Sequence, residues 1–184
     1  MKLQEKNSLM VGVYDDVIPL KVCEGLINLF ENSVENHEYF DNDHKPCFTQ
    51  LNINTIHPEL VRDLVSYVKV AYGKYSVDVK NKYLPKLKVL EEFRLKRYNT
   101  SGDERFDEHI DVIDYSTARR SLAFLYYLND NDGNTVFPLQ NLNVEPKCGR
   151  VVVFSPTWQY PHSGLPPTNN NKYILSTYLH YGSN

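Results

Sequence analysis

Two histidines and one aspartate of this chain could together bind a metal ion. His109 and Asp111 are separated by one residue, and side chains on an extended chain alternate between its two faces, so these two would point the same way. His162 follows a predicted strand at residues 150–154 and would come from a separate part of the sheet. Two histidines and one carboxylate form the facial triad that binds non-haem ferrous iron and leaves coordination positions open. Catalytic zinc also accepts three protein ligands, so the triad alone does not specify the metal.

A lysine and two hydroxyl groups could complete a site for a small acid beside that metal. Lys172 begins the last strand-like segment, where it is either a solvated strand end or a cation that pairs with one carboxylate of a small dicarboxylate. The other end of such an acid would chelate the metal. Tyr98 and Thr135 could donate uncharged hydrogen bonds to the same acid, and Tyr98 could equally pack on a sheet.

The segments that would position these residues change in type along the chain. Two amphipathic helices are expected, at residues 19–33 and from about 58 to 80, because apolar residues recur there at helical spacing. A strand is expected between them at residues 47–54. Short segments separated by turn clusters follow and are expected to be strands, at residues 90–98, 121–128, 135–137, 150–154 and 172–181. The sequence therefore predicts a mainly β fold of the sandwich or barrel type, with two helices covering one face of a sheet.

The composition describes one globular domain and argues against several classes of protein. The chain has 184 residues, of which 41% are hydrophobic, so we expect a single domain over residues 1–184. The net charge of −3 argues against a nucleic-acid partner, and no apolar run approaches the roughly 20 residues that cross a membrane. Three widely spaced cysteines predict reduced thiols. The polar N-terminus lacks the apolar core of a secretory signal, so we expect a cytoplasmic protein without a membrane partner.

Five separated motifs follow one another in an order that is typical of one enzyme family. They are Tyr98 with Gly102, Phe106, His109 and Asp111; residues 134–138 (NTVFP); residues 149–154 (GRVVVF); residues 162–164 (HSG); and Lys172 with Tyr173. With this combination the chain resembles the iron(II)- and 2-oxoglutarate-dependent dioxygenases, and within them the prolyl 4-hydroxylase branch. The resemblance covers residues 90–181 well and extends more loosely to the first helix.

The resemblance implies a fold, a set of cofactors and a set of site residues. The fold is a distorted double-stranded β-helix, or jelly-roll, with its catalytic core at about residues 88–181 and supporting helices at about 15–85. The cofactors are Fe(II), 2-oxoglutarate as co-substrate and O2, and ascorbate can serve as a reductant. The implied site residues are, for iron, His109, Asp111 and His162, and, for 2-oxoglutarate, Lys172, Tyr98 and Thr135.

The implied activity is hydroxylation of an unactivated C–H bond, with succinate and CO2 as co-products. The default substrate is a peptidyl proline, and the alternative is another protein side chain or a free amino acid. Tyr115, Trp158 and Tyr160 could line a groove for an extended peptide. Because the chain ends without an endoplasmic-reticulum retention signal, it is expected to be of bacterial or viral type.

Two functions of other classes stay open at this point. One is a non-catalytic jelly-roll that binds a metal or a sugar. The other is a zinc hydrolase, which would need a general base near the triad. Glu108 is adjacent to His109 but should face away from the ligands, since neighbouring side chains on a strand alternate.

Overall fold

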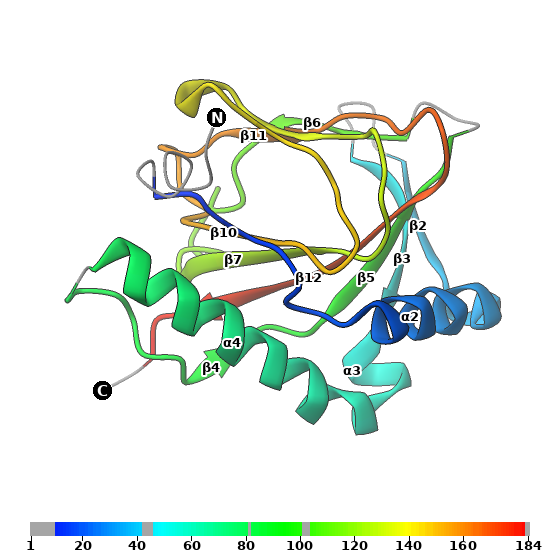
Figure 1. The fold of residues 1–184 in the computed structure, drawn as a ribbon, viewed down its shortest axis with the longest axis horizontal. Coiled ribbons are helices and arrows are strands. Elements are labelled where there is room, and N and C mark those ends of the chain that lie inside the picture. The colour runs from blue at the N-terminus through cyan, green and yellow to red at the C-terminus, as the bar shows by residue number, and fades with distance from the viewer. Residues whose placement is uncertain (1–9, 42–45, 81, 101–103, 183–184) are drawn as a thin grey trace.

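The computed structural model describes residues 10–41, 46–80, 82–100 and 104–182, and it contains two β-sheets that face each other (Figure 1). The larger sheet runs in the order β1 (Gly12–Tyr14), β10 (Val151–Phe154), β7 (Arg120–Tyr127), β12 (Lys172–His180), β5 (Arg94–Tyr98), β3 (Cys47–Asn52) and β2 (Glu38–Asp41), with β4 (Val89–Leu90) also paired to β12. The smaller sheet runs in the order β6 (Phe106–His109), β11 (His162–Gly164), β8 (Thr135–Phe137) and β9 (Leu142–Val144). All described pairs are antiparallel. The predicted double-stranded β-helix is confirmed. The motif residue Gly102 lies outside the described residues.

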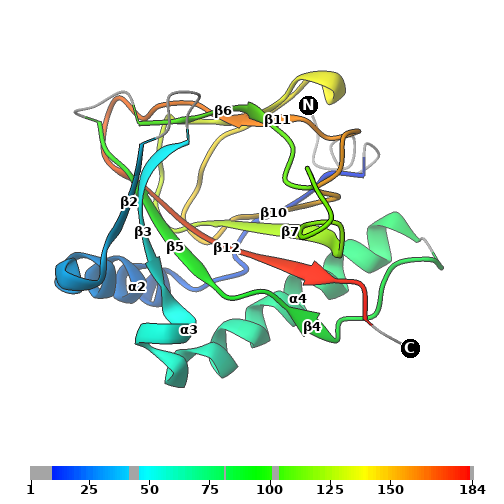
Figure 2. The same cartoon turned by 180° about the vertical axis from the view of Figure 1, so that it is seen from behind.

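Two helices cover the outer face of the larger sheet, as predicted. They are α2 (Leu20–Asn32) and α4 (Val61–Val79), and both views place them on the side away from β6 and β11 (Figures 1 and 2). Leu26 and Phe30 of α2 and Leu64 and Val68 of α4 belong to one buried cluster with residues of the sheet. A helix that presents apolar residues on one face is stable here because the sheet removes that face from water.

The strands divide their side chains between two hydrophobic cores. On β12, Tyr173, Leu175 and Leu179 join the core beneath the helices, whereas Ile174 belongs to the core between the two sheets. Successive side chains of a strand point to opposite faces, so one strand can serve both cores. This alternation also sends the side chain of Lys172 into the space between the sheets, where it is fully buried.

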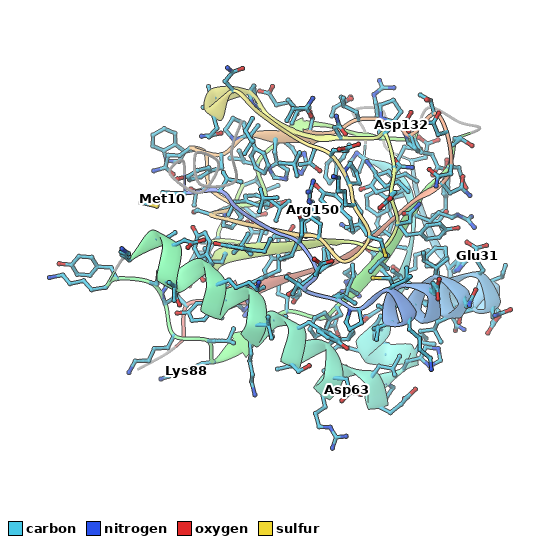
Figure 3. All side chains as sticks on the ribbon, in the orientation of Figure 1. Met10, Glu31, Asp63, Lys88, Asp132 and Arg150 are labelled. Atoms are coloured by element: carbon cyan, nitrogen blue, oxygen red, sulfur yellow. The ribbon has the colours of Figure 1, made fainter. Side chains whose placement is uncertain are left out.

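The N-terminal segment is fixed to the sheet by a charged pair. Arg150 (labelled in Figure 3) donates from Nε to Asp15 Oδ1 over 2.5 Å, and the amides of Val17 and Ile18 donate to the carbonyl of Gly149. The segment thereby enters α2 at Pro19, which lies just before the first helical residue.

Two of the predicted strands differ from the observed ones in their limits, because main-chain amides there donate to asparagine side chains and not to a neighbouring strand. The strand predicted at residues 47–54 ends at Asn52, whose side chain accepts from the amide of Asn54 over 3.1 Å and begins the short helix α3 (Ile53–Ile56). The strand predicted at residues 90–98 is divided into β4 and β5. Between them, the amide of Phe93 donates to Asn54 Oδ1 and its carbonyl accepts from Ile53, so that stretch pairs with α3.

Three short 3-10 helices complete the secondary structure of the described residues. Three-residue 3-10 turns lie at Val34–Asn36, Pro58–Leu60 and Pro138–Gln140. The three cysteines are free. Within the described ranges, no helix combines the length and the apolar character needed to span a membrane.

Candidate active site

Three potential metal ligands meet at the edge of the smaller sheet. His109 ends β6 and His162 begins β11, and these two residues are direct partners across the strand pair. Asp111 lies just beyond β6, where its amide donates to the carbonyl of Pro156 over 3.1 Å. Its carboxylate oxygens lie 3.5 Å from His109 Nε2 and 3.7 Å from His162 Nε2, and the three ligand atoms are within 4.8 Å of one another. This arrangement can hold one metal ion.

Hydrogen bonds to the main chain leave the correct ring nitrogens available. His109 Nδ1 lies 2.7 Å from the carbonyl of Asp107, and His162 Nδ1 lies 3.1 Å from the carbonyl of Tyr160. A carbonyl oxygen can only accept, so in each ring Nδ1 carries the hydrogen and Nε2 keeps a lone pair for a metal. Such outer hydrogen bonds orient metal-bound histidines in proteins. The donor set therefore fits a divalent transition metal.

Aromatic rings hold the two imidazoles in place. The ring of Phe106 stacks on His109, with centroids 3.5 Å apart and planes 7° from parallel. Phe137 and Phe154 pack against His162, with centroids 5.6 and 4.7 Å away. Close packing of this kind limits the rotation of each ligand ring, so the site is preorganised.

Two further residues, Tyr178 and Arg120, hold Asp111 in position. Tyr178 donates its hydroxyl to Oδ1 over 2.9 Å, and Arg120 donates to the main-chain carbonyl of Asp111 over 2.9 Å. Burial acts to raise the pKa of this carboxyl, but the hydrogen bond with His109, the charges of both histidines and the Tyr178 hydroxyl outweigh it and lower the pKa to about 2. Asp111 is therefore an ionised carboxylate at neutral pH.

A pocket leads from these ligands to a buried lysine between the sheets. Lys172, Tyr98 and Thr135 line this pocket together with all three potential ligands. Lys172 Nζ lies 4.6 Å from the centroid of the Tyr98 ring. Thr135 accepts a hydrogen bond of 2.7 Å from Tyr127, which leaves the threonine hydroxyl hydrogen free for another acceptor.

Two loops form the Lys172 end of the pocket, and hydrogen bonds to Asp132 link them. Asp132 (labelled in Figure 3) accepts hydrogen bonds from the amide and hydroxyl of Thr168. Lys172 Nζ donates to the carbonyls of Gly133 and Leu165, each at 2.9 Å. Burial lowers the pKa of Lys172 to about 7. An ammonium with two carbonyl acceptors retains one hydrogen for an incoming anion.

The three aromatic residues considered for a peptide groove lie outside this pocket. Tyr115 and Trp158 are 98% and 70% exposed, and Tyr160 is partly buried against the core between the sheets. Glu108 is exposed and does not line the pocket, so it does not face the three ligands.

Sequence reasoning missed several residues that contact the site. Tyr178 and Arg120 fix Asp111, and Tyr127 supports Thr135. Lys96 lines the pocket and was not among the candidates. Its position two residues before Tyr98 on one strand was the available signal, because alternate residues share a face.

Comparisons with known proteins agree with this geometry. Residues 93–180, which contain β5 to β12, match the model of the 2OG-Fe(II) oxygenase superfamily. Among the curated proteins, none matches the sequence.

Solved structures share the fold at low sequence identity. A prolyl hydroxylase from Trichoplax adhaerens, in complex with a peptide fragment of the hypoxia inducible factor oxygen degradation domain, has a TM-score of 0.76 and 15% identity, over 97% of this chain and 87% of that one. A prolyl-4-hydroxylase from Pseudomonas putida has a TM-score of 0.74 and 16% identity, over 98% of both chains. A viral collagen prolyl hydroxylase from Paramecium Bursaria Chlorella virus-1 has a TM-score of 0.65 and 17% identity, over 95% and 97%.

The family match and the site coincide on the same part of the chain. The matched residues contain the cluster of His109, Asp111 and His162 and the buried Lys172. Enzymes of this superfamily use Fe(II), 2-oxoglutarate and O2, which the donor set and the cationic end of the pocket fit. The match to the 2OG-Fe(II) oxygenase superfamily covers residues 93–180, and the site within that match is the site of a 2-oxoglutarate-dependent dioxygenase.

Proposed function

We propose that this dioxygenase hydroxylates a prolyl residue of a protein or peptide. In this proposal His109, Asp111 and His162 bind Fe(II), and Lys172 binds the distal carboxylate of 2-oxoglutarate with help from Tyr98 and Thr135. The observation that carries the proposal is one pocket with three metal-binding atoms at one end and a buried, partly satisfied ammonium at the other.

The chain's own residues bind and orient the reactants. The bound iron with its co-substrate supplies the oxidant for the C–H bond, so no acid or base of the protein is needed for that step. Lys172 and Thr135 fix one end of the co-substrate, which sets how its other end meets the metal. The stacked ring of Phe106 and the packed ring of Phe154 hold the two ligand imidazoles in position.

Exposed apolar side chains near the metal end support a peptide substrate. Ile113, 74% exposed, lies two residues beyond Asp111, and Trp158, 70% exposed, lies two residues beyond Pro156, whose carbonyl holds Asp111. Exposed apolar groups beside a polar site are typical of surfaces that bind another chain. The fold likeness to prolyl hydroxylases, one of them solved with a peptide, points to the same class of substrate.

The test is turnover on a panel of proline-containing peptides. The protein, Fe(II), 2-oxoglutarate, ascorbate and O2 are combined with each peptide and with its Pro→Ala counterpart. We expect succinate release stimulated by proline peptides, together with one added oxygen atom on the prolyl residue by mass spectrometry. Equal stimulation by the alanine counterparts, or oxygen added to another residue, would refute prolyl hydroxylation and favour another side chain.

Tyr178 is expected to contribute to metal affinity through Asp111. Tyr178→Phe removes the hydroxyl that donates to Asp111 Oδ1 and keeps the buried ring. Loss of such an outer partner typically weakens metal binding by roughly 10–100-fold. Fe(II) titration under anaerobic conditions measures the change. The control is Tyr72→Phe, since that hydroxyl donates to the carbonyl of Pro85 away from the site. Equal metal affinity in Tyr178→Phe and Tyr72→Phe would contradict this role.

The affinity for 2-oxoglutarate should fall as pH rises above about 7. Burial lowers the pKa of Lys172 to about 7, so the free site loses the lysine proton above that pH, whereas a bound carboxylate favours the charged form and raises the pKa again. Binding above pH 7 must therefore take up a proton, which weakens it. Titrations of metal-saturated protein at several pH values measure the trend. Lys172→Arg stays charged and provides the control, because it leaves the titration of Lys96 in place. A pH trend equal in both proteins would contradict the assignment.

A further inference from the structure

A second lysine lines the pocket between its two ends. Lys96 lies on β5, directly opposite Ile174 of β12, and both residues line the pocket. Two pairs away in the same ladder, and on the same face, Tyr98 lies opposite Lys172 at the closed end. Lys96 therefore lies on the pocket wall two pairs of residues from Lys172, in the direction of Tyr178, which holds Asp111.

Among the described residues, Lys96 is the pocket cation without an acceptor. Its Nζ lies 4.8 Å from the centroid of the Phe48 ring, and no carboxylate or carbonyl of the described chain bonds to it. Lys172, in contrast, donates to two carbonyls. The nearby Arg94 and Arg120 are each paired with a glutamate. Lys96 is thus the ammonium that remains available for a ligand.

The charges of the loaded site leave this ammonium unbalanced. The ferrous ion is offset by Asp111 and by one carboxylate of 2-oxoglutarate, and Lys172 offsets the other carboxylate. Lys96, which is partly buried, then adds one positive charge to the pocket wall, where a charge without a partner is unfavourable. Burial lowers the pKa of Lys96 to about 8, although the negative charge of Asp111 acts in the opposite direction. A further anion in the pocket would remove this cost.

We propose that Lys96 binds a carboxylate of the primary substrate and so selects substrates that carry a negative charge close to the reacting carbon. Such a carboxylate is the side chain of an acidic residue beside the hydroxylated one, or a free carboxyl group of the substrate itself. The co-substrate is the weaker candidate, because both of its carboxylates already have a cation. This inference rests on the proposed function, since it describes the substrate of the same pocket.

The experiment measures binding to the anaerobic protein loaded with Fe(II) and 2-oxoglutarate, so it needs no turnover. The probes are two matched pairs: blocked peptides that carry Glu or Gln beside a proline, and proline or prolinamide. We expect the wild type to prefer the carboxylate member of at least one pair by about tenfold or more, the usual contribution of a charge-assisted hydrogen bond. The pair that shows the preference identifies the source of the carboxylate.

Three variants make the result specific to Lys96. Lys96→Met keeps the length of the side chain and its packing on Phe48, and it should bind both members of each pair equally. Lys96→Arg should retain part of the preference because it keeps the charge. Lys69→Met, on an exposed face of α4, should behave as the wild type. Circular dichroism checks that all variants are folded.

The outcomes separate this inference from the proposed function. Three results would each overturn the inference. The wild type could show no preference for a carboxylate, or the preference could persist in Lys96→Met. The third is a loss of 2-oxoglutarate affinity in Lys96→Met without any change in preference. Admission of O2 to the bound complexes then tests the proposed function separately. A Lys96-dependent preference without oxygen added to proline would refute prolyl hydroxylation and leave the carboxylate site standing.

Discussion

Replacing Lys172 with alanine is expected to weaken 2-oxoglutarate binding by about 2–5 kcal/mol, the usual cost of removing one partner from a buried charge pair. The free energy is large because Lys172 is fully buried, so its loss leaves the carboxylate inside the protein without a cation. Anaerobic titration of 2-oxoglutarate into the Fe(II)-loaded protein measures the change through the visible absorption of the chelate. Fe(II) affinity itself should change little, because the three ligands remain.

A matched variant separates the lost charge from a general disturbance of the pocket. Lys172→Arg should restore part of the affinity, since the longer planar guanidinium keeps the charge but needs different room. The carbonyls of Gly133 and Leu165 lose their donor in Lys172→Ala, so the free energy of unfolding is measured alongside. Equal 2-oxoglutarate affinity in the wild type and Lys172→Ala would show that the co-substrate does not bind there.

Removal of either histidine ligand is expected to abolish turnover through loss of the metal. His109→Gln and His162→Gln each delete one of the three ligand atoms that lie within 4.8 Å of one another. The effect on Fe(II) affinity should exceed the roughly 10–100-fold that is typical for loss of an outer hydrogen-bond partner. Calorimetric titration with Fe(II) under anaerobic conditions measures it directly.

Histidines elsewhere in the fold supply the controls for this prediction. His57 pairs with Glu59 on the surface, and His180 pairs with Glu91 over 2.7 Å. His57→Gln should bind iron as the wild type does. The Fe(II) affinity of His180→Gln should stay within a few-fold of the wild-type value, because Glu91 keeps its pair with Arg120. If His180→Gln lost the metal and His162→Gln kept it, the ligand set would have been assigned to the wrong histidine.

The apolar strands could be predicted from the sequence because their side chains enter the two cores by a simple alternation. In β10, Val151 and Val153 enter one core while Val152 and Phe154 enter the other, so both faces are apolar and the strand is an uninterrupted apolar run. The helices α2 and α4 were equally visible, since each has one apolar face.

The short strands that carry the ligands could not be predicted as strands. β6 and β11 are four and three residues long and mostly polar, so they have no periodicity. They are extended because they pair with each other and β11 pairs with β8. The ligands His109 and His162 were therefore found from their residue types and from the family resemblance, and not from the secondary structure around them.

For other residues near the site, the residue type alone does not predict whether the side chain reaches the pocket. Tyr115 and Trp158 are aromatic and near the ligands in sequence, yet the loops leave both exposed. Lys96 and Arg120 have ordinary surface residue types, yet the register of β5 and β7 turns them toward the pocket and toward Asp111. Which partners a charged residue meets depends on the pairing of distant strands, and that pairing is a property of the whole fold.

Turnover under isotopically labelled O2 tests the dioxygenase activity itself. A 2-oxoglutarate-dependent dioxygenase divides the two oxygen atoms between succinate and the hydroxylated product. We expect one labelled oxygen atom in succinate, which forms only when Fe(II) and 2-oxoglutarate are both present. His162→Gln should form no labelled succinate. Succinate that carries no label, or label incorporated equally by the wild type and His162→Gln, would contradict this expectation.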